Sequence, residues 1–208
     1  MSTLGIIDYG AGNLASVCNS FRALGVEGRL IRTPEDATGI THLVLPGVGA
    51  FGDCAKALQH QGLADFIRTW IAAGKPFLGI CIGYQILFES SDETPDARGL
   101  GIFSGHVRRF NDSGQKIPHM GWNAVQPVDA AHPLWADMGP EPYFYYVHSY
   151  YPQPTDQGLI AATTTYADTF AAAIIRGNVV ATQFHPEKSQ QQGLRLLRNF
   201  LTLGPKLS

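Results

Sequence analysis

The sequence predicts an α/β protein with an open, mostly parallel central sheet, helices on both faces and an added antiparallel β region. In the first half, short apolar runs end in glycine-rich turns and are followed by helical patterns, as in βαβ units. From about residue 100 the pattern changes to closely spaced β-type segments. Hydrophobic residues make up 45% of the 208 residues and charged residues 15%, which is typical of a sheet buried on both faces.

The composition also excludes several classes of function. A formal net charge of -2 provides no strong field for nucleic acid or for an anionic membrane. The three cysteines are widely spaced and odd in number, and no C-x-x-C pair indicates a metal. No signal-peptide pattern or bilayer-length apolar stretch occurs. We therefore expect a single domain over residues 1–208, in the cytoplasm, with no nucleic-acid or membrane partner.

The chain opens with a strand, a glycine turn and a helix. Residues 4–8 form a short apolar strand, and residues 14–24 have the spacing of an amphipathic helix. Gly10 and Gly12 form only part of a dinucleotide-binding fingerprint, because Ala15 stands where the third glycine would be. We interpret this loop as a tight turn near the site rather than a nucleotide cradle.

A second glycine-rich loop follows the third predicted strand. Strands are expected at residues 28–32 and 42–45, and the loop at 46–52 reads PGVGAFG. It lacks the lysine of a phosphate-binding loop, but its glycines allow backbone amides to approach a ligand closely. An ordinary strand-to-helix connection is the alternative. One long helix is predicted over residues 53–73, ending at Gly74.

Cys81 stands where the apolar period changes from that of a strand to that of a helix. Residues 76–80 suit a buried strand, and Gly79 and Gly83 flank the cysteine at two positions on either side. This is the layout of a nucleophile elbow. The following helix N-terminus should lower the thiol pKa and provide free N–H groups for an oxyanion hole. The alternative is a small buried core cysteine, which would not need the glycines.

The second half is rich in strands. A polar surface loop is expected at residues 90–101, a hairpin turn at Gly177 and Asn178, and a closing helix at 193–203. The predicted β segments are residues 101–110, 115–120, 122–127, 143–150, 163–166, 171–176 and 179–184.

A base and an acid follow the last of these strands. His185 and Glu187 are two residues apart, and Pro186 between them restricts the backbone. A cysteine nucleophile needs a nearby base, and the base needs an orienting acceptor. Cys81, His185 and Glu187 supply all three at strand ends, where open α/β sheets place their sites. A solvated loop histidine and a zinc ligand are the alternatives, but no H-E-x-x-H motif or credible third ligand is present.

Together these motifs resemble the class I (triad) glutamine amidotransferases. Six stretches in order narrow the resemblance to the glutaminase subunits of imidazole glycerol phosphate synthase, the HisH family. They are residues 8–14 (DYGAGNL), 45–51 (LPGVGAF), 79–85 (GICIGYQ), 118–123 (PHMGWN), 146–150 (YVHSY) and 183–190 (QFHPEKSQ). Each stretch alone is weak, but the ordered set spans nearly the whole chain and is specific.

The resemblance implies a flavodoxin-like fold and the hydrolysis of L-glutamine to glutamate and ammonia. It implies a heterodimer with a HisF-like (β/α)8 cyclase subunit, which receives the ammonia, and it implies no metal or organic cofactor. By the same resemblance, Cys81 attacks the side-chain amide, His185 moves the proton and Glu187 orients His185. Ile82, Val48 and Gly49 would form the oxyanion hole. The glutamine pocket would be lined by Gly47, Gln85, Ser149 and Tyr150.

The expected partner interface covers the mouth of the site. Trp122 follows a glycine in an apparent turn, where an aromatic residue is either part of the core or an interface anchor. Tyr145 lies on the strand beside the predicted glutamine pocket, and Lys188 directly follows Glu187. We expect these three residues to contact the cyclase.

Two other functions stay open at this stage. One is a different triad amidotransferase or cysteine hydrolase on the same fold, such as the glutaminase of pyridoxal phosphate synthase. The PGVGAF loop and the HPEKSQ stretch argue against it. The other is a binding subunit that has the fold without catalysis, against which the intact cysteine, histidine and glutamate argue.

Overall fold

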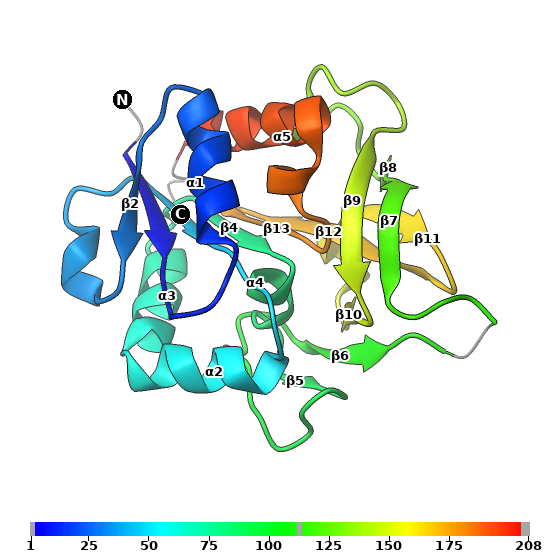
Figure 1. The fold of residues 1–208 in the computed structure, drawn as a ribbon, viewed down its shortest axis with the longest axis horizontal. Helices are drawn as coiled ribbons and strands as arrows, with labels where there is room; N and C mark the ends of the chain where they lie inside the picture. Colours follow the sequence, from blue (N-terminus) through cyan, green and yellow to red (C-terminus); the bar gives the residue numbers. More distant parts are fainter. Residues whose placement is uncertain (1–2, 112–113, 205–208) are drawn as a thin grey trace.

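A computed structural model describes residues 3–111 and 114–204 of the chain. Its main sheet has eight strands in the order β2-β1-β3-β4-β13-β12-β11-β8 (Figure 1). The parallel strands are β2 (Gly28–Ile31), β1 (Leu4–Ile7), β3 (His42–Leu45), β4 (Phe77–Ile80) and β13 (Val179–Thr182). The antiparallel strands are β12 (Thr169–Arg176), β11 (Ile160–Thr165) and β8 (Gln126–Pro127). The predicted fold class is confirmed.

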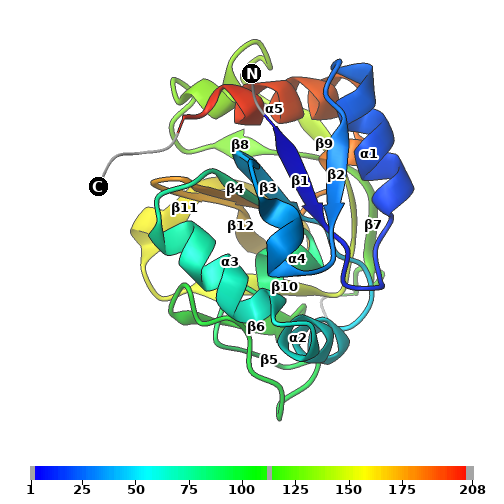
Figure 2. The same ribbon diagram turned by 90° about the vertical axis from the view of Figure 1, so that its left-hand side faces the viewer.

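Helices cover both faces of this sheet, as Figure 2 shows. Helices α1 (Leu14–Ala23) and α5 (Gln190–Thr202) pack together on one face, and α2 (Phe51–His60) and α3 (Leu63–Ala72) on the other. Strands β1, β3, β4 and β13 are buried along their whole length, as expected for strands covered on both faces. In the part of the chain that the structure describes, no helix is long and apolar enough to cross a membrane.

The single helix predicted over residues 53–73 is wrong, because the structure divides it into α2 and α3. Gly62 adopts a left-handed conformation at φ 70°, which glycine reaches without a Cβ penalty. Its N–H donates to the Gln59 carbonyl at 3.2 Å, and the Gln61 N–H to the Ala57 carbonyl at 3.1 Å. These are the bonds that end a helix, so the glycine stops α2 and redirects the chain into α3.

The strand-rich half adds two small sheets beside the antiparallel end of the main one (Figure 1). One contains β5 (Ser90–Ser91), β6 (Gly105–Arg109) and β10 (Tyr150–Pro154); the other pairs β7 (His119–Ala124) with β9 (Tyr143–His148). The predicted strand at 143–150 is therefore two strands. His148 pairs with His119 and Tyr150 with Arg109, so the chain changes sheets at Ser149. Residues 115–118 precede β7 and are not in a strand.

Short 3-10 turns complete the fold. They are η1 (Pro34–Ala37), η2 (Pro133–Trp135), η3 (Gln157–Leu159) and η4 (Pro186–Lys188). Helix α5 begins three residues earlier than predicted, so Gly193 lies inside the helix rather than at its first position. A Cβ at Gly193 would lie 1.8 Å from the Pro186 carbonyl oxygen, so only glycine lets the helix approach η4 this closely.

Candidate active site

The site is assembled at the carboxyl ends of three neighbouring parallel strands. Strand β4 pairs with β3 through Leu45 and Gly79, and with β13 through Ile80 and Thr182. The next residues of each strand therefore leave the same edge of the sheet side by side. This edge is where doubly wound α/β sheets bind their ligands.

Cys81 stands in a tight turn whose packing requires glycine on both sides. Its backbone has φ 54° and ψ -107°, an unusual conformation for a residue with a side chain. A Cβ at Gly83 would lie 1.9 Å from the Leu45 carbonyl oxygen, and one at Gly79 would lie 2.5 Å from the Gly83 oxygen. The two glycines therefore let the elbow pack directly on β3 and hold the thiol at the strand end.

The helix after the elbow is shorter than its sequence pattern indicates. Helix α4 spans only Ile82–Gln85. The carbonyls that would continue it are occupied by a returning loop, since Leu100 N–H donates to Ile86 O at 2.7 Å and Ile102 N–H to Leu87 O at 2.9 Å. One turn of helix contributes little dipole, but its first N–H groups still lack intrahelical acceptors.

His185 and Glu187 form a buried pair. Glu187 Oε1 accepts a hydrogen bond from His185 Nδ1 at 2.7 Å, and both side chains are at most 2% exposed. Burial lowers the pKa of His185, but the neighbouring Cys81 and the Glu187 carboxylate outweigh it and raise the pKa to about 10. The imidazole therefore holds a proton beside the sulfur at neutral pH.

A cavity of about 280 Å³ opens in front of Cys81 and His185. We call it the elbow cavity. Its lining residues are Val48, Gly49, Cys81, Ile82, Gln85, Glu93, Pro118, Val147, His148, Ser149, Tyr150 and His185. Eight of the residues predicted for the triad, oxyanion hole and glutamine pocket are among them.

The other two predicted residues of this group lie behind the elbow cavity wall. Glu187 reaches the cavity only through His185. Gly47 packs under the elbow, where a Cβ would lie 2.7 Å from both the Gly83 nitrogen and the Ile82 Cβ. Gly47 thus holds the 46–49 loop against α4 and does not face the cavity.

Several residues of the site were not predicted from the sequence. Glu93, placed in a surface loop, lines the cavity, and its carboxylate accepts the Phe51 N–H at 2.7 Å and so caps α2. Gln183 is fully buried, and its Nε2 lies 3.7 Å from Cys81 Sγ. Glu93 lies in no motif, and Gln183 opens the QFHPEKSQ stretch but was given no role; the signal for Gln183 is its place after β13, in register with the elbow.

The predicted interface residues lie outside the cavity and contact one another. The Trp122 and Tyr145 rings meet edge to face at 6.3 Å, and Lys188 Nζ lies 5.8 Å from the Tyr145 ring. We call Trp122, Tyr145 and Lys188 the docking patch. The Tyr145 carbonyl accepts the His185 N–H at 2.9 Å and its own N–H donates to Ser189 Oγ at 3.0 Å. The patch is therefore bonded through the backbone to the segment that carries His185.

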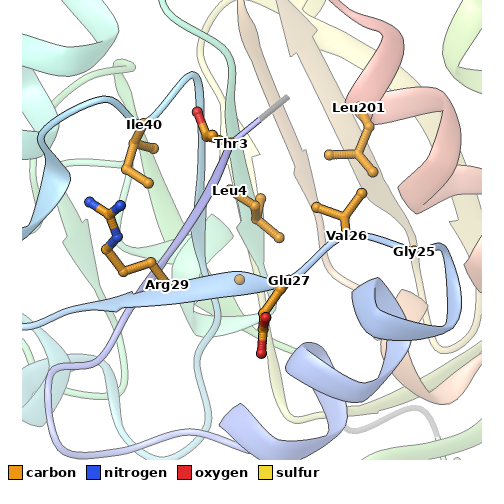
Figure 3. Close-up of a pocket in the computed structure, with 9 residues that line it drawn as sticks. Thr3, Leu4, Gly25, Val26, Glu27, Arg29, Ile40 and Leu201 are labelled. Atoms are coloured by element: carbon orange, nitrogen blue, oxygen red, sulfur yellow. The ribbon is translucent and has the colours of Figure 1, made fainter. Parts of the chain in front are cut away.

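A larger hollow of about 690 Å³ lies at the opposite, amino end of the sheet (Figure 3). It is bordered by β2, the start of β1 and α5, and its charged lining residues are Glu27 and Arg29. It contains no nucleophile with a neighbouring base, so its size does not make it the better candidate. Nowhere in residues 3–111 and 114–204 do three His, Cys, Asp or Glu side chains gather in a group that could hold a metal ion.

A buried histidine pair adjoins the elbow cavity. His148 Nδ1 lies 2.8 Å from the Tyr150 carbonyl, which only accepts, so this nitrogen carries the proton. His148 Nε2 then accepts from His119 Nδ1 at 3.0 Å. His119 stacks on Tyr146 and Tyr166, with ring centroids 4.6 and 4.0 Å away. Burial lowers the pKa of His119 to about 4 and that of His148 to about 3, so both are neutral at pH 7.

Because of this histidine pair, we expect folding stability to fall at pH values well above those at which most carboxylates are protonated. Both folded-state pKa values lie below the unfolded value near 6.5, so the stability is present above that pH and is lost as pH falls. Between pH 7 and 5 we expect the free energy of unfolding to fall by about 4 kcal/mol, from about 1.4 kcal/mol per histidine for each pH unit below 6.5. Urea unfolding across this range measures it. A variant carrying His119→Asn and His148→Asn should have a clearly flatter profile; equal slopes would contradict the assignment.

Comparison with known proteins agrees with this architecture. A family profile described as glutamine amidotransferase class-I matches residues 5–203. A crystal structure of a glutamine amidotransferase superposes with a TM-score of 0.75 at 20% identity, covering 95% of this chain and 97% of that one. PurLQS from Thermotoga maritima gives 0.74 at 19% identity, over 97% and 98% of the chains. These structures share the fold. By the family profile, the chain belongs to the class-I glutamine amidotransferases.

Two curated relatives match over nearly their whole length. Imidazole glycerol phosphate synthase subunit HisH of Microcystis aeruginosa is 46% identical over 210 residues, covering 100% of this chain and 99% of that protein. The subunit of the same name from Methylococcus capsulatus is 47% identical over 214 residues, covering 99% and 98%. Within the class-I amidotransferases, the chain therefore belongs to the HisH family.

Proposed function

We propose that this chain is the glutaminase subunit of an imidazole glycerol phosphate synthase, folded as one domain over residues 1–208. It hydrolyses L-glutamine to glutamate and ammonia for histidine biosynthesis. The observation that carries the proposal is the elbow itself: Cys81 at a strand end, beside a buried His185–Glu187 pair and an open cavity. The relatives' shared name supports the particular synthase.

In the proposed reaction Cys81 Sγ attacks the side-chain amide carbon of glutamine. The sulfur–carbon bond forms as the carbonyl electrons move to oxygen, which becomes an oxyanion. His185, protonated at neutral pH, gives its proton to the amide nitrogen; the oxyanion then collapses, the carbon–nitrogen bond breaks, and ammonia leaves behind a thioester on Cys81. His185 next takes a proton from water, which attacks the thioester carbon; the carbon–sulfur bond breaks, and glutamate and the Cys81 thiolate are released. Glu187 holds the imidazole in orientation and stabilises its charged form.

The oxyanion and the substrate are assigned to the walls of the elbow cavity. The Ile82 N–H, at the first position of α4, is one proposed oxyanion donor, and the Val48–Gly49 peptide region supplies the other. Gln85 Oε1 is buried without a hydrogen-bond partner in the described chain and is available to the substrate. Ser149 and Tyr150 line the same wall.

The ammonia is proposed to pass to a HisF-like (β/α)8 cyclase docked over the cavity mouth. There it reacts with N1-(5-phosphoribulosyl)-formimino-AICAR-phosphate and gives imidazole glycerol phosphate and AICAR. Large apolar side chains are exposed around this region: Trp122 is 47% exposed, Met120 62% and Val48 37%. Exposed aromatic and methionine side chains are typical of interface anchors, which supports the docking patch as the contact.

Single alanine variants of the docking patch test this placement. Trp122→Ala should weaken the complex by about tenfold or more, since buried tryptophan anchors commonly exceed 1.4 kcal/mol. Tyr145→Ala and Lys188→Ala should lower the transfer of ammonia at saturating cyclase, because they support the seal next to His185. Calorimetric titration and the yield of product per glutamine consumed measure the two effects. Unchanged affinity and unchanged yield in all three would defeat the placement.

One assay separates the proposed function from its rivals. Glutamate release is measured for the chain alone, with a HisF-like cyclase, and with cyclase plus its nucleotide substrate. We expect a nearly idle chain alone and a strong increase only with both partners, since a free glutaminase would waste glutamine. If the barrel subunit of pyridoxal phosphate synthase stimulated glutamine hydrolysis instead, the chain would be the glutaminase of that enzyme. No hydrolysis under any condition would leave a binding subunit.

A further inference from the structure

Gln183 contacts the nucleophile and has no part in the reaction above. Strand β13 runs parallel to β4 with Thr182 opposite Ile80, and the Cys81 N–H donates to the Thr182 carbonyl at 2.8 Å. The next residue of β13 therefore lies beside Cys81. Gln183 is fully buried, and its Nε2 lies 3.7 Å from Cys81 Sγ, within hydrogen-bonding distance for sulfur.

The amide of Gln183 is oriented by a second amide behind it. Gln85 Nε2 lies 3.0 Å from the Tyr150 carbonyl and 3.2 Å from Gln183 Oε1. A carbonyl can only accept, so Gln85 must present its NH2 group there. The oxygen of Gln183 then accepts from the same NH2 group, and its own NH2 group is left facing the sulfur. The arrangement makes Gln183 a donor to Cys81.

The anchor of this chain of amides is itself rigid. The Tyr150 carbonyl also accepts from His148 Nδ1 at 2.8 Å, and His148 belongs to the buried histidine pair. Gln85 is 2% exposed and Gln183 0%, so water does not compete for these bonds. Buried amides are costly unless they are paired, and an apolar side chain would fill the same space more cheaply.

We propose that Gln183 is a positioning residue of the glutaminase, donating an N–H to Cys81 Sγ and holding the sulfur for attack. A donor to sulfur stabilises the thiolate, and the fixed direction of the amide restricts where the sulfur can lie. Gln85 thereby has two tasks, since its NH2 group fixes Gln183 while its free oxygen faces the substrate. The catalytic use of the thiolate rests on the function proposed above. The contact between Gln183 and Cys81 does not.

The test compares Gln183→Met, which keeps the length and volume without the N–H, with Gln183→Glu, which places a carboxylate oxygen against the sulfur. In the complex with cyclase and its ligand, Gln183→Met should lower kcat about 10- to 100-fold, the effect of one hydrogen bond to a charged group, with KM within about twofold. Gln183→Glu should lower kcat further, because like charges repel. Asn199→Leu is the control: it removes two side-chain amide hydrogen bonds on α5, one part-buried to the Leu134 carbonyl and one exposed to the Ala136 carbonyl, and Asn199 is not among the residues that line the elbow cavity.

A second readout on the full-length chain does not depend on glutamine turnover. The rate of iodoacetamide modification at Cys81, followed by mass spectrometry, is measured from pH 5 to 10. The pH at which the modification rate is half-maximal should rise by about one unit in Gln183→Met and by more in Gln183→Glu. It should not change in Asn199→Leu. Wild-type kcat and an unmoved midpoint in Gln183→Met would overturn the proposal, as would a loss of kcat that only tracks lowered thermal stability. If the wild type did not hydrolyse glutamine, the modification profiles would still decide the role of Gln183.

Discussion

The Cys81→Ala variant will lose glutamine hydrolysis, while its complex with the cyclase still makes product from added ammonium salt. Removing the nucleophile removes the covalent route altogether, and losses of about 10⁴- to 10⁶-fold are typical of such deletions. The cyclase reaction needs only ammonia, which can enter from solution. Glutamate release and imidazole glycerol phosphate formation, measured side by side with each nitrogen source, separate the two effects.

The matched control is Cys18→Ala. Cys18 is a free, half-buried thiol on α1, remote from the elbow cavity lining. It should hydrolyse glutamine at the wild-type rate. Retained hydrolysis in purified Cys81→Ala, or a comparable loss in Cys18→Ala, would remove Cys81 from its assigned role.

The second large effect is expected at Gly49, in the loop that lines the cavity opposite the elbow. Gly49 has φ +95°, a conformation that side chains rarely adopt, although a Cβ there would meet no atom within 4 Å. Gly47 packs against the elbow and Gly49 is permissive, so Val48 stands between them and each of its two peptides has a glycine at its other end. Such a peptide can turn either its carbonyl or its N–H toward the substrate, and only the N–H stabilises an oxyanion.

The switch gives the partner a defined task. In the idle state the Val48 N–H would not complete the oxyanion hole. We expect the cyclase and its ligand to shift the population toward the state in which this N–H points into the cavity.

Gly49→Ala should therefore depress the ligand-stimulated rate far more than the basal rate, by about 10²- to 10³-fold, the value of one oxyanion donor. Gly39→Ala is the control, since Gly39 also has a positive φ, +77°, with free space around it, but lies in an exposed loop before β3. Glutaminase rates with and without the cyclase ligand measure both. Full stimulation in Gly49→Ala, or an isolated wild type already at the stimulated rate, would refute the switch and leave the triad untouched.

The sequence predicts those features that depend on local pattern. The four fully buried strands and α1 lie within one residue of the ends expected from apolar runs, except at the carboxyl end of β13, because their burial and period are strong. The break at Gly62 was missed, since one glycine inside a helical pattern is compatible with both a continuous and a divided helix.

The neighbours of the nucleophile depend on register rather than on local pattern. Gln183 and His148 reach the site because β13 pairs with β4 and because β9 ends beside β10. Glu93 reaches it from a polar loop whose composition is that of any surface turn. The spacing of apolar residues along the chain does not show which strands pair. The place of these residues at the site therefore follows only from the strand pairing.

The backbone conformation of Cys81 has a consequence for how the protein can evolve. A residue with a side chain at φ 54° and ψ -107° is held there at a cost of about 1–3 kcal/mol, against a total stability of about 5–15 kcal/mol for a typical domain. Glycine would relieve that cost, so selection for robustness alone would replace the cysteine. A strained thiol at this position serves chemistry rather than durability, so a variant selected only for stability would first lose its activity at the elbow.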